Sequence, residues 1–333
     1  MSVTFDVIKG AKDGKLVEAK TTRALKPNQV YIEITHSGVC GTDEHFRHTD
    51  QVLGHEGIGI VREAGSGVTN VKVGDRVGVG YFHEVCGVCP KCLAGWDQYC
   101  EVKKEYGMAN LDVGTFSHGV VWNADLVFPI PDGIDSVSAA PLMCAGGTVW
   151  TVLSEFGVRP TDRVGILGVG GLGHMAIKLA AALGAHVVVL SSSEAKRQEA
   201  KDYGANEYHV FRSGQTLEGM KPLKHLLLCG NANIDYSSLL PLMDTQGTIY
   251  PITVDFNPSS IPLFPVLHSG IRIQGSLVAS RRCMQELLRF CAAQGIKPTT
   301  MQFPLTRAGA EEAMAKLREG KIRYRAVLVR EGV

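Results

Sequence analysis

The chain has 333 residues and a formal net charge of +1, so we expect two domains and neither nucleic acid nor an anionic membrane as partner. The first residues lack the charged segment and apolar core of a signal peptide. The longest apolar run, residues 175–190, is interrupted by Lys178, Gly184 and His186, so no membrane span is expected. Nine cysteines without an export signal suit metal ligands or buried thiols better than disulfides, and we expect a cytoplasmic protein.

Residues 1 to about 145 consist of short β-like runs separated by Gly, Asp and Asn turns. The clearest runs are Val30–Ile34, Gly57–Val61 and Arg76–Val79. This texture predicts an irregular β-barrel. The same region holds every dense group of metal-ligand residue types in the chain.

Strand-like and helix-like segments alternate from about residue 160 to residue 277. Arg163–Leu167 is expected to be a short buried strand, and apolar residues between Leu172 and Leu183 recur at the spacing of one helix face. A second helix is expected over residues 194–203. Further strands are expected at 186–190, 208–211, 226–229, 248–252 and 271–274. Six strands with intervening helices predict a doubly wound parallel sheet.

The last segment changes texture again, with helices expected at 283–293 and 308–319 and a closing strand at 325–329. We therefore expect the chain to leave the first domain, build the α/β domain and return to complete the first. The expected division is 1–147 with 279–333 for the catalytic domain, including a lobe at about 84–102, and 148–278 for the nucleotide-binding domain.

A glycine-rich loop lies between the first predicted strand and helix of the α/β region. Its residues are Gly168, Val169, Gly170, Gly171, Leu172 and Gly173, a G-x-G-x-x-G pattern. In this setting the glycines allow a tight turn, close approach of a pyrophosphate and close packing of helix on strand. The alternative is a turn that merely favours glycine. We interpret the loop as a dinucleotide-binding site.

The next strand ends in Ser191, Ser192 and Ser193, where an NAD site usually carries a carboxylate for the ribose. Hydroxyls followed by the cations Lys196 and Arg197 favour the 2′-phosphate of NADP(H). Ser191 and Glu194 alternatively form a capping box for the following helix, and Glu194 can also serve a ribose hydroxyl.

Four cysteines fall within 15 residues: Cys86, Cys89, Cys92 and Cys100. Four thiolates without a histidine complete a closed tetrahedral zinc site, which predicts a structural metal. An iron–sulfur cluster is the competing interpretation, but its usual bacterial spacing ends in Cys-Pro after a short gap, which this segment lacks.

A second set of ligand types is dispersed along the chain: Cys40, His55 of a Gly-His-Glu triplet, and Cys144. Two cysteines and one histidine leave a fourth position open on zinc, as in catalytic sites. Taken singly, each cysteine is equally consistent with a small buried hydrophobe and His55 with a core histidine.

These motifs occur together in an order that resembles zinc-dependent medium-chain alcohol dehydrogenases. The segments that carry the resemblance are Cys40-Gly41-Thr42-Asp43-x-His45, Gly54-His55-Glu56, the four-cysteine lobe, Pro141–Gly146 and Gly168–Gly173. The triple serine and the ending Arg323-Tyr324-Arg325 resemble the cinnamyl alcohol dehydrogenase-like branch. The resemblance implies a GroES-like β-barrel catalytic domain and a Rossmann domain that binds NADP(H).

The resemblance also implies individual roles at the metal. Cys40, His55 and Cys144 would bind a catalytic zinc, which with the four-cysteine site makes two Zn²⁺ per chain. Glu56 would lie behind the ion as an occasional ligand or electrostatic tuner, and Asp43 would orient His55. On the residues alone, Asp43 and its neighbour Thr42 are equally consistent with a helix N-cap pair.

Further roles are implied for the substrate and cofactor. Thr42 would hydrogen-bond the substrate oxygen and pass a proton towards His45, while His48 is an extra histidine that competes as the outlet. Phe82 would line the substrate pocket, although it is equally consistent with plain core, and Ser276 would contact the cofactor. Only 14 residues separate Cys40 from His55, fewer than is usual in the family, so the pocket mouth is expected to differ.

The function implied by the resemblance is hydride transfer between NADP(H) and a primary alcohol or aldehyde, aromatic or allylic substrates included. A polyol or other secondary-alcohol dehydrogenase using NAD is one alternative, and a non-catalytic nucleotide-binding redox regulator is another. The open position of the dispersed ligand set favours an enzyme over a regulator. A homodimer is expected, with residues 271–277 as the edge strand that pairs.

Overall fold

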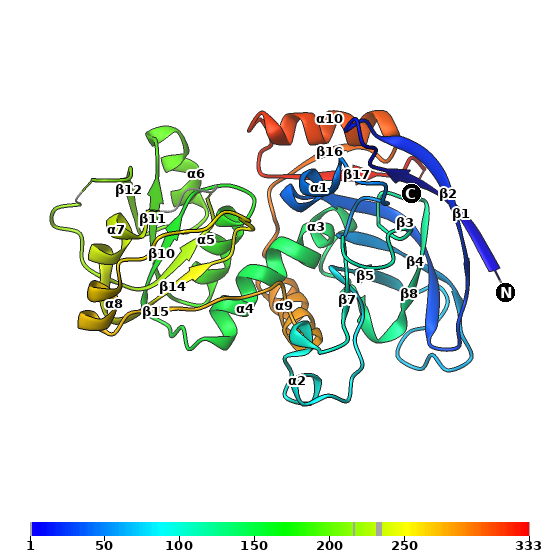
Figure 1. Ribbon diagram of the computed structural model, residues 1–333, viewed down its shortest axis with the longest axis horizontal. Helices are drawn as coiled ribbons and strands as arrows, with labels where there is room; N and C mark the ends of the chain where they lie inside the picture. Colours follow the sequence, from blue (N-terminus) through cyan, green and yellow to red (C-terminus); the bar gives the residue numbers. More distant parts are fainter. Residues whose placement is uncertain (1, 216, 231–234, 333) are drawn as a thin grey trace. The chain divides into compact units, whose positions relative to one another are not determined.

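The computed structural model describes residues 2–215, 217–230 and 235–332. The chain divides into two compact units, one formed by Met1–Gly147 with Ala279–Val333 and the other by Thr148–Val278. In the first unit, the amino-terminal and carboxyl-terminal parts of the chain lie side by side, blue beside red in Figure 1. The GroES-like and Rossmann fold classes expected from the sequence are both confirmed.

The first unit is built on a strongly bent sheet with strand order β16-β17-β3-β4-β5-β9, and β8 also pairs with β3. β8 pairs with β3 and leads through the short turn Ala124–Leu126 into β9, which pairs with β5, so the sheet closes on itself around a buried interior. The strands are β3 (Gln29–Val39), β4 (Gly57–Ala64), β5 (Arg76–Val79), β8 (Gly119–Asn123), β9 (Val127–Pro129), β16 (Thr300–Pro304) and β17 (Arg325–Val329). This bent sheet is the irregular barrel.

Shorter elements surround this sheet. They are the hairpin β1 (Ser2–Lys9) and β2 (Val17–Ala24), the pair β6 (Phe82–Glu84) and β7 (Lys104–Glu105), and the helices α1 (Gly41–Phe46), α2 (Pro90–Leu93), α3 (Ser136–Pro141), α9 (Arg281–Gln294) and α10 (Arg307–Arg318). Ser280 and Thr306 accept hydrogen bonds from backbone N–H groups at the starts of α9 and α10. Gly295 ends α9 in the left-handed conformation at φ 64°. The two helices and the strand expected in the last segment are confirmed.

One continuous helical stretch, Ser136–Glu155, is long and apolar enough by composition to cross a membrane, and 89% of its tested window is buried inside the structure. That burial is typical of a core helix in a soluble protein. The stretch joins α3 to α4 (Gly147–Glu155) through a π-helical turn, Leu142–Gly146. The expectation that residues 175–190 are the longest apolar candidate is therefore wrong, because among the described residues only 136–155 meet the length and composition of a membrane span.

The second unit is a six-stranded parallel sheet of order β12-β11-β10-β13-β14-β15, as the sequence predicts. Its strands are β10 (Arg163–Leu167), β11 (His186–Ser191), β12 (Glu207–Val210), β13 (Leu223–Leu228), β14 (Met243–Pro251) and β15 (Arg272–Ile273). Its helices are α5 (Gly173–Ala182), α6 (Arg197–Asp202), α7 (Tyr236–Leu239) and α8 (Leu263–Ser269). β15 has only two residues, so the expected edge strand is shorter than 271–277.

The strand order places the glycine loop where a ligand binds in such sheets. The chain leaves β10 for β11 on one side of the sheet and later adds β13 on the other side of β10. The carboxyl end of β10 is therefore a topological switch point, outside which open α/β sheets bind their ligands. Gly168 begins directly after β10, and α5 begins five residues later at Gly173.

Candidate functional site

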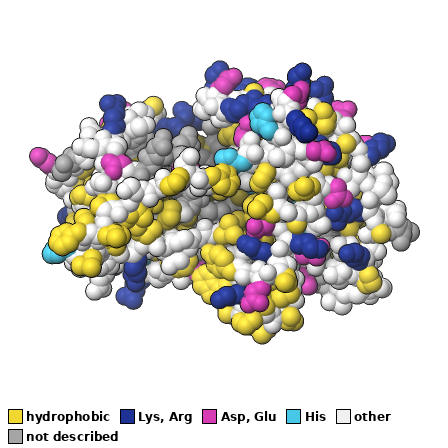
Figure 2. Space-filling view, in the orientation of Figure 1, with side chains coloured by type: hydrophobic (Ala, Val, Ile, Leu, Met, Phe, Trp, Pro, Cys, Tyr) yellow, Lys and Arg dark blue, Asp and Glu magenta, His cyan; other side chains and the backbone are white. Residues whose placement is uncertain are grey.

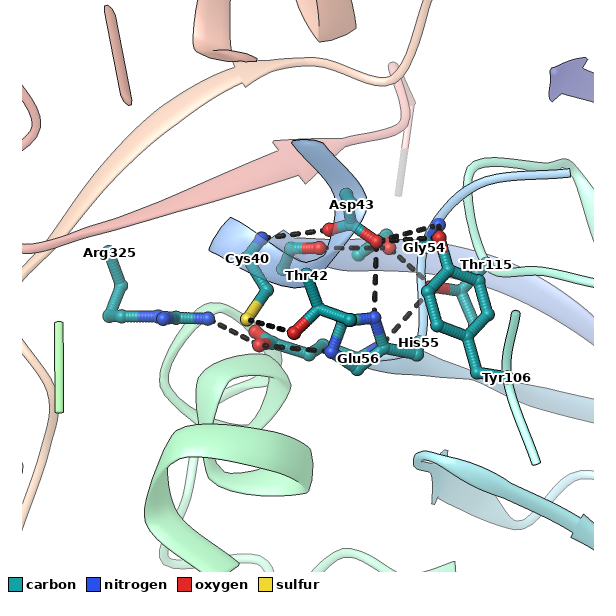
Figure 3. Close-up of polar contacts among 11 residues, drawn as sticks. Cys40, Thr42, Asp43, Gly54, His55, Glu56, Tyr106, Thr115 and Arg325 are labelled. Carbon is teal, nitrogen blue, oxygen red and sulfur yellow. Dashed lines mark hydrogen bonds and ion pairs between the residues drawn. The ribbon is translucent and has the colours of Figure 1, made fainter. Parts of the chain in front are cut away.

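The dispersed ligand types meet in the first unit. One ligand atom each from Cys40, His55, Glu56 and Cys144 lies within 4.8 Å of the other three. Cys40 ends β3 and begins α1, the His55–Glu56 pair leads into β4, and Cys144 lies in the π-helical turn, an arrangement often found at functional sites. Figure 3 shows the side chains of Cys40, His55 and Glu56 converging.

Asp43 ties α1 to this cluster. Its Oδ2 accepts a hydrogen bond from the backbone N–H of Cys40 at 2.8 Å and completes a capping box at the start of the helix. Its Oδ1 lies 3.1 Å from His55 Nδ1. The N-cap residue is Cys40, so the interpretation of Thr42 and Asp43 as an N-cap pair is wrong. Asp43, the third residue of the helix, closes the capping box and is the partner of His55.

The hydrogen bond to Asp43 fixes which nitrogen of His55 faces the cluster. With Nδ1–H donating to the carboxylate, the lone pair remains on Nε2, which is buried and has no hydrogen-bond partner among the described residues. Burial disfavours the charged imidazole, but Asp43 outweighs it and raises the pKa of His55 well above its ordinary value, so a metal ion would take the Nε2 lone pair by displacing a proton. A buried nitrogen lone pair beside two sulfurs is a ready metal ligand.

Glu56 and Arg325 form a fully buried ion pair behind His55. Arg325 Nη2 donates to Glu56 Oε1, whereas Oε2 has no partner among the described residues. Burial raises the pKa of Glu56 to about 7, against the opposing effect of Arg325. A side chain at Gly38 of β3 would lie 1.9 Å from Glu56 Oε2, so glycine is required there.

The two cysteines of this cluster are polarised. The hydrogen bond from Cys144 and the neighbouring His55 hold the pKa of the Cys40 thiol well below its usual value, despite burial. The hydrogen bond with Cys40 and burial raise the pKa of Cys144 well above its usual value. Two sulfurs and one imidazole nitrogen are donor types that zinc prefers, so a zinc ion fits this group.

The four-cysteine lobe forms a second group, with all four Sγ atoms within 4.8 Å of one another. The backbone N–H of Cys89 donates to Cys86 Sγ at 3.3 Å, and that of Cys86 donates to Cys100 Sγ at 3.3 Å. Backbone hydrogen bonds from Cys92 and Glu101 lower the pKa of Cys89 to about 6. Four sulfurs at this spacing, two of which accept hydrogen bonds from backbone N–H groups, fit a closed structural zinc site.

The glycine loop of the second unit is tightly packed at Gly173 and open at Gly170. A side chain at Gly173 would lie 1.8 Å from the carbonyl oxygen of Gly168, which itself has φ +93°. A side chain at Gly170 would meet nothing within 4 Å, so the loop is open there. Lys196 Nζ donates to the carbonyl of Val169 at 2.5 Å and thus lies over the loop. The loop fits a pyrophosphate.

The chain matches two protein-family models: alcohol dehydrogenase GroES-like domain over residues 26–132 and zinc-binding dehydrogenase over residues 171–293. It is 35% identical over 323 residues to NADP-dependent alcohol dehydrogenase C 1 of Mycolicibacterium smegmatis, covering 92% of each chain. It is 35% identical over 320 residues to the probable formaldehyde dehydrogenase AdhA of Bacillus subtilis, covering 92% and 91%. The chain belongs to the zinc-dependent medium-chain alcohol dehydrogenase family.

Solved structures of this alcohol dehydrogenase family agree. A cinnamyl alcohol dehydrogenase of Sorghum bicolor superposes with a TM-score of 0.90 at 29% identity over 98% of both chains. A cinnamyl alcohol dehydrogenase of Helicobacter pylori, complexed with NADP(H), superposes with a TM-score of 0.89 at 27% identity over 99% of both chains. The resemblance stated from the sequence, including its cinnamyl alcohol dehydrogenase-like branch, is confirmed.

The remaining residues that the alcohol dehydrogenase motifs single out lie at different distances from solvent. Thr42 is half-buried, and its hydroxyl lies 3.7 Å from Cys40 Sγ. His45 is exposed on α1, and His48 is exposed with Nδ1 3.4 Å from the carbonyl of Lys12. Phe82 is 5% exposed, and its ring packs against Tyr81.

The cofactor-binding candidates lie in the second unit. Ser191 is the buried last residue of β11, whereas Ser192 and Ser193 are exposed. The capping box expected between Ser191 and Glu194 is wrong, because Ser191 still belongs to the strand and Glu194 pairs with Arg197 at 2.5 Å. Gly171 and Leu172 complete the loop, and Ser276 Oγ is buried without a hydrogen-bond partner among the described residues.

Sequence reasoning missed four residues around the metal cluster of this alcohol dehydrogenase: Arg325 as the partner of Glu56, Tyr81, Tyr106 and Thr115. The Tyr81 ring lies 5.7 Å from the His55 ring, and Thr115 Oγ1 accepts from the Glu56 N–H at 3.3 Å. Arg325 belongs to the Arg323-Tyr324-Arg325 ending that resembles the cinnamyl alcohol dehydrogenase-like branch, but nothing in that motif indicates contact with Glu56. Nothing in the sequence pattern indicates the other three.

Proposed function

We propose that the protein catalyses NADP(H)-dependent interconversion of a primary alcohol and its aldehyde on a catalytic zinc. The observation that carries this proposal is the buried cluster of Cys40, His55 and Cys144, in which His55 Nε2 has no partner among the described residues. These three residues would hold the catalytic ion, and Cys86, Cys89, Cys92 and Cys100 would hold the structural one. Bound zinc supplies a Lewis acid for the carbonyl oxygen, and NADPH supplies the hydride.

The protein residues hold this site in one arrangement. Asp43 keeps a proton on His55 Nδ1, so that Nε2 is the nitrogen directed at the proposed metal position. Arg325 compensates the negative charge of the Glu56 carboxylate beside the two cysteines, while the unpartnered Oε2 remains free to approach the metal position. Glu56 therefore suits the role of an electrostatic tuner or occasional ligand.

Proton movement is proposed to start at Thr42. Its hydroxyl lies beside Cys40 Sγ, where it donates to the substrate oxygen as charge develops on it. His45 follows three residues later on the same helix, so both side chains lie on one face, and its exposure permits exchange with solvent. His48 lies against Lys12 and is the alternative outlet.

The cofactor is proposed to be NADP(H), bound by the glycine loop and by the end of β11. The exposed Ser192 and Ser193 hydroxyls and the Lys196 ammonium suit a 2′-phosphate. Glu194, the residue that could favour NAD, is held in an ion pair with Arg197. Ser276, with its unpartnered hydroxyl, and buried Ser191 complete the proposed set.

We propose that the enzyme is a cytoplasmic homodimer that pairs through the second unit. β15 lies at the sheet edge, and several large apolar side chains of α8 and the segment before it are exposed: Val254, Phe256, Leu263, Phe264 and Leu267. Figure 2 shows hydrophobic side chains gathered over α8. Such a patch favours burial by a partner. Light scattering of the native protein and of Phe264→Glu tests this assignment, and a monomeric native protein would contradict it.

The proposed activity is tested by following NADPH oxidation with a panel of aliphatic and aromatic aldehydes, beside NADH and a set of polyols. We expect turnover with NADPH and an aldehyde, together with two zinc ions per chain. Faster oxidation of polyols with NAD would support the polyol dehydrogenase instead. Nucleotide binding without turnover of any substrate would support the non-catalytic regulator.

A further inference from the structure

Tyr106 lies directly behind the proposed catalytic metal site. It is 1% exposed and follows β7, where its backbone N–H donates to the carbonyl of Tyr81 at 2.9 Å. Its hydroxyl donates to Asp43 Oδ1 at 2.8 Å and accepts from the Gly54 N–H at 3.0 Å. Figure 3 shows the phenol oxygen beside the Asp43 carboxylate and the Gly54 nitrogen.

The ring of Tyr106 is held by packing on several sides. It lies 4.7 Å from the His55 ring at an interplanar angle of 32°, and it meets the Phe46 ring edge-on at 5.5 Å. Tyr81 approaches at 6.1 Å. Aromatic contacts of this kind leave the phenol one orientation, so its hydroxyl is aimed at Asp43 before any ligand binds.

Asp43 depends on donors because it is a fully buried carboxylate. It accepts from the Cys40 N–H at 2.8 Å, the Gly54 N–H at 3.2 Å, His55 Nδ1 at 3.1 Å and the Tyr106 hydroxyl at 2.8 Å. The first three donors belong to the segments that carry the proposed ligands. The fourth donor, Tyr106, belongs to the segment after β7 and therefore links the carboxylate to a part of the chain that carries none of the proposed ligands.

Tyr106 also restrains the turn that precedes His55. Gly54 has φ +88°, and its N–H is shared between Asp43 Oδ1 and the Tyr106 hydroxyl. One hydroxyl thus holds both the carboxylate that orients the imidazole and the backbone that carries it. Loss of the hydroxyl would remove one of the three donors to Asp43 Oδ1 and one of the two acceptors of the Gly54 N–H, and would loosen both attachments.

We propose that Tyr106 is a positioning residue for the catalytic zinc: its hydroxyl fixes Asp43 and Gly54 so that His55 Nε2 points at the metal position. This inference rests on the proposed function. Tyr106 acts only through Asp43 and His55 and touches neither substrate nor cofactor in this role. A plain core aromatic, by contrast, would be replaced by phenylalanine without consequence for the metal.

The test compares zinc release from the wild-type holoenzyme and from Tyr106→Phe under excess chelator, followed with a metallochromic indicator. His55→Ala, which lacks the catalytic ion, identifies the phase that belongs to each site. We expect release from the Cys40–His55–Cys144 site to accelerate about tenfold, the lower range for loss of a group that supports a metal ligand. Release from the four-cysteine site should stay unchanged.

Tyr250→Phe is the matched control. Tyr250 is also fully buried, and its hydroxyl lies 3.0 Å from His225 Nδ1 in the second unit, so the same atom is removed from an equally buried network. Neither zinc phase should change in this variant. Combining Tyr106→Phe with Asp43→Asn should add less than about twofold to the effect of Asp43→Asn alone, because the hydroxyl acts through that carboxylate.

Each other outcome overturns the inference. Unchanged release in Tyr106→Phe would make the residue a core aromatic. Equal acceleration at both zinc sites, or the same acceleration in Tyr250→Phe, would mean general loosening of the fold. If the wild-type enzyme held only the four-cysteine zinc, the proposed function would fail and this inference with it. Two zinc ions with unchanged release would overturn the role of Tyr106 alone.

Discussion

The two clusters of proposed zinc ligands are assembled in opposite ways. The four-cysteine lobe takes all its ligands from 15 consecutive residues, Cys86 to Cys100, and two of its four cysteines are only partly buried. The Cys40–His55–Glu56–Cys144 cluster gathers residues from three places in the first unit and is supported by Asp43, Tyr106 and Arg325. One cluster is specified by local spacing and the other by the fold. Substitutions should therefore act locally in the first case and through distant supports in the second.

The largest expected effect is at the fold-assembled cluster. His55→Ala should lower the zinc content from two ions to one and reduce aldehyde turnover by about 10³-fold or more, because metal activation contributes several kcal/mol to the barrier. Metal analysis and NADPH oxidation measure both. His118→Ala, an exposed histidine of the same unit, should retain both ions. A His55→Ala enzyme with two zinc ions and near-normal turnover would contradict the assignment.

The second largest effect is expected at Arg325, which pairs with Glu56 of the fold-assembled cluster. Arg325→Leu leaves Glu56 buried without its cation and should lower the free energy of unfolding by about 3–5 kcal/mol. Urea unfolding measures it. Arg62→Leu removes the partner of Glu33 from an ion pair in which Arg62 is 53% exposed, and should cost less than about 1 kcal/mol. Equal losses in the free energy of unfolding of the two variants would show that burial of the ion pair does not determine its contribution to stability.

The same contrast explains what could be predicted from the sequence. The spacing of its cysteines is enough to predict the four-cysteine site, and the alternation of strand-like and helix-like segments is enough to predict the parallel sheet. The fold brings Arg325 to Glu56, 269 positions away, by pairing Ala326 of β17 with Val39 of β3. No local pattern encodes that register. The capping box at Ser191 failed for a related reason: β11 continues through Ser191 by pairing with Val210, so the next helical turn begins later.

The locally specified lobe should respond differently. Cys100→Ser should remove the lobe zinc and lower the free energy of unfolding by about 2 kcal/mol or more, because a structural metal contributes directly to folding. The catalytic ion should remain, so turnover at low temperature should stay within about threefold of wild type by the independence of distant sites. Metal content and thermal unfolding report the two effects. Cys291→Ser, a buried thiol of α9 outside both clusters, should keep two zinc ions.

The cofactor loop gives a third locally specified site. Lys196→Ala should raise the KM for NADPH about tenfold and leave that for NADH unchanged, since a charge-assisted hydrogen bond to phosphate contributes roughly 1.5 kcal/mol. Initial rates with the two cofactors test this. Lys201→Ala, an exposed lysine of α6, is the control and should change neither value. A parallel rise for both cofactors would place Lys196 on the pyrophosphate rather than on the 2′-phosphate.

The smallest effect is expected at a carboxylate whose partners are also brought together by the fold but which is partly exposed. Glu207 of β12 is also reached by residues from other elements, Arg163 and His186, and by its neighbour His209, but its side chain is 30% exposed. The hydrogen bond from Arg163, followed by those from the two histidines, holds the pKa of Glu207 well below its usual value of 4.5. A lowered pKa in the folded state stabilises the fold above the unfolded value, and this contribution is lost as the pH falls below it. Thermal unfolding of wild type and Glu207→Gln should therefore differ by a few degrees at pH 6, and this difference should shrink steadily as the pH falls from 4.5 towards the lower folded-state pKa of Glu207. A difference that does not shrink below pH 4.5 would mean that packing, and not charge, supplies the contribution of this fold-assembled network.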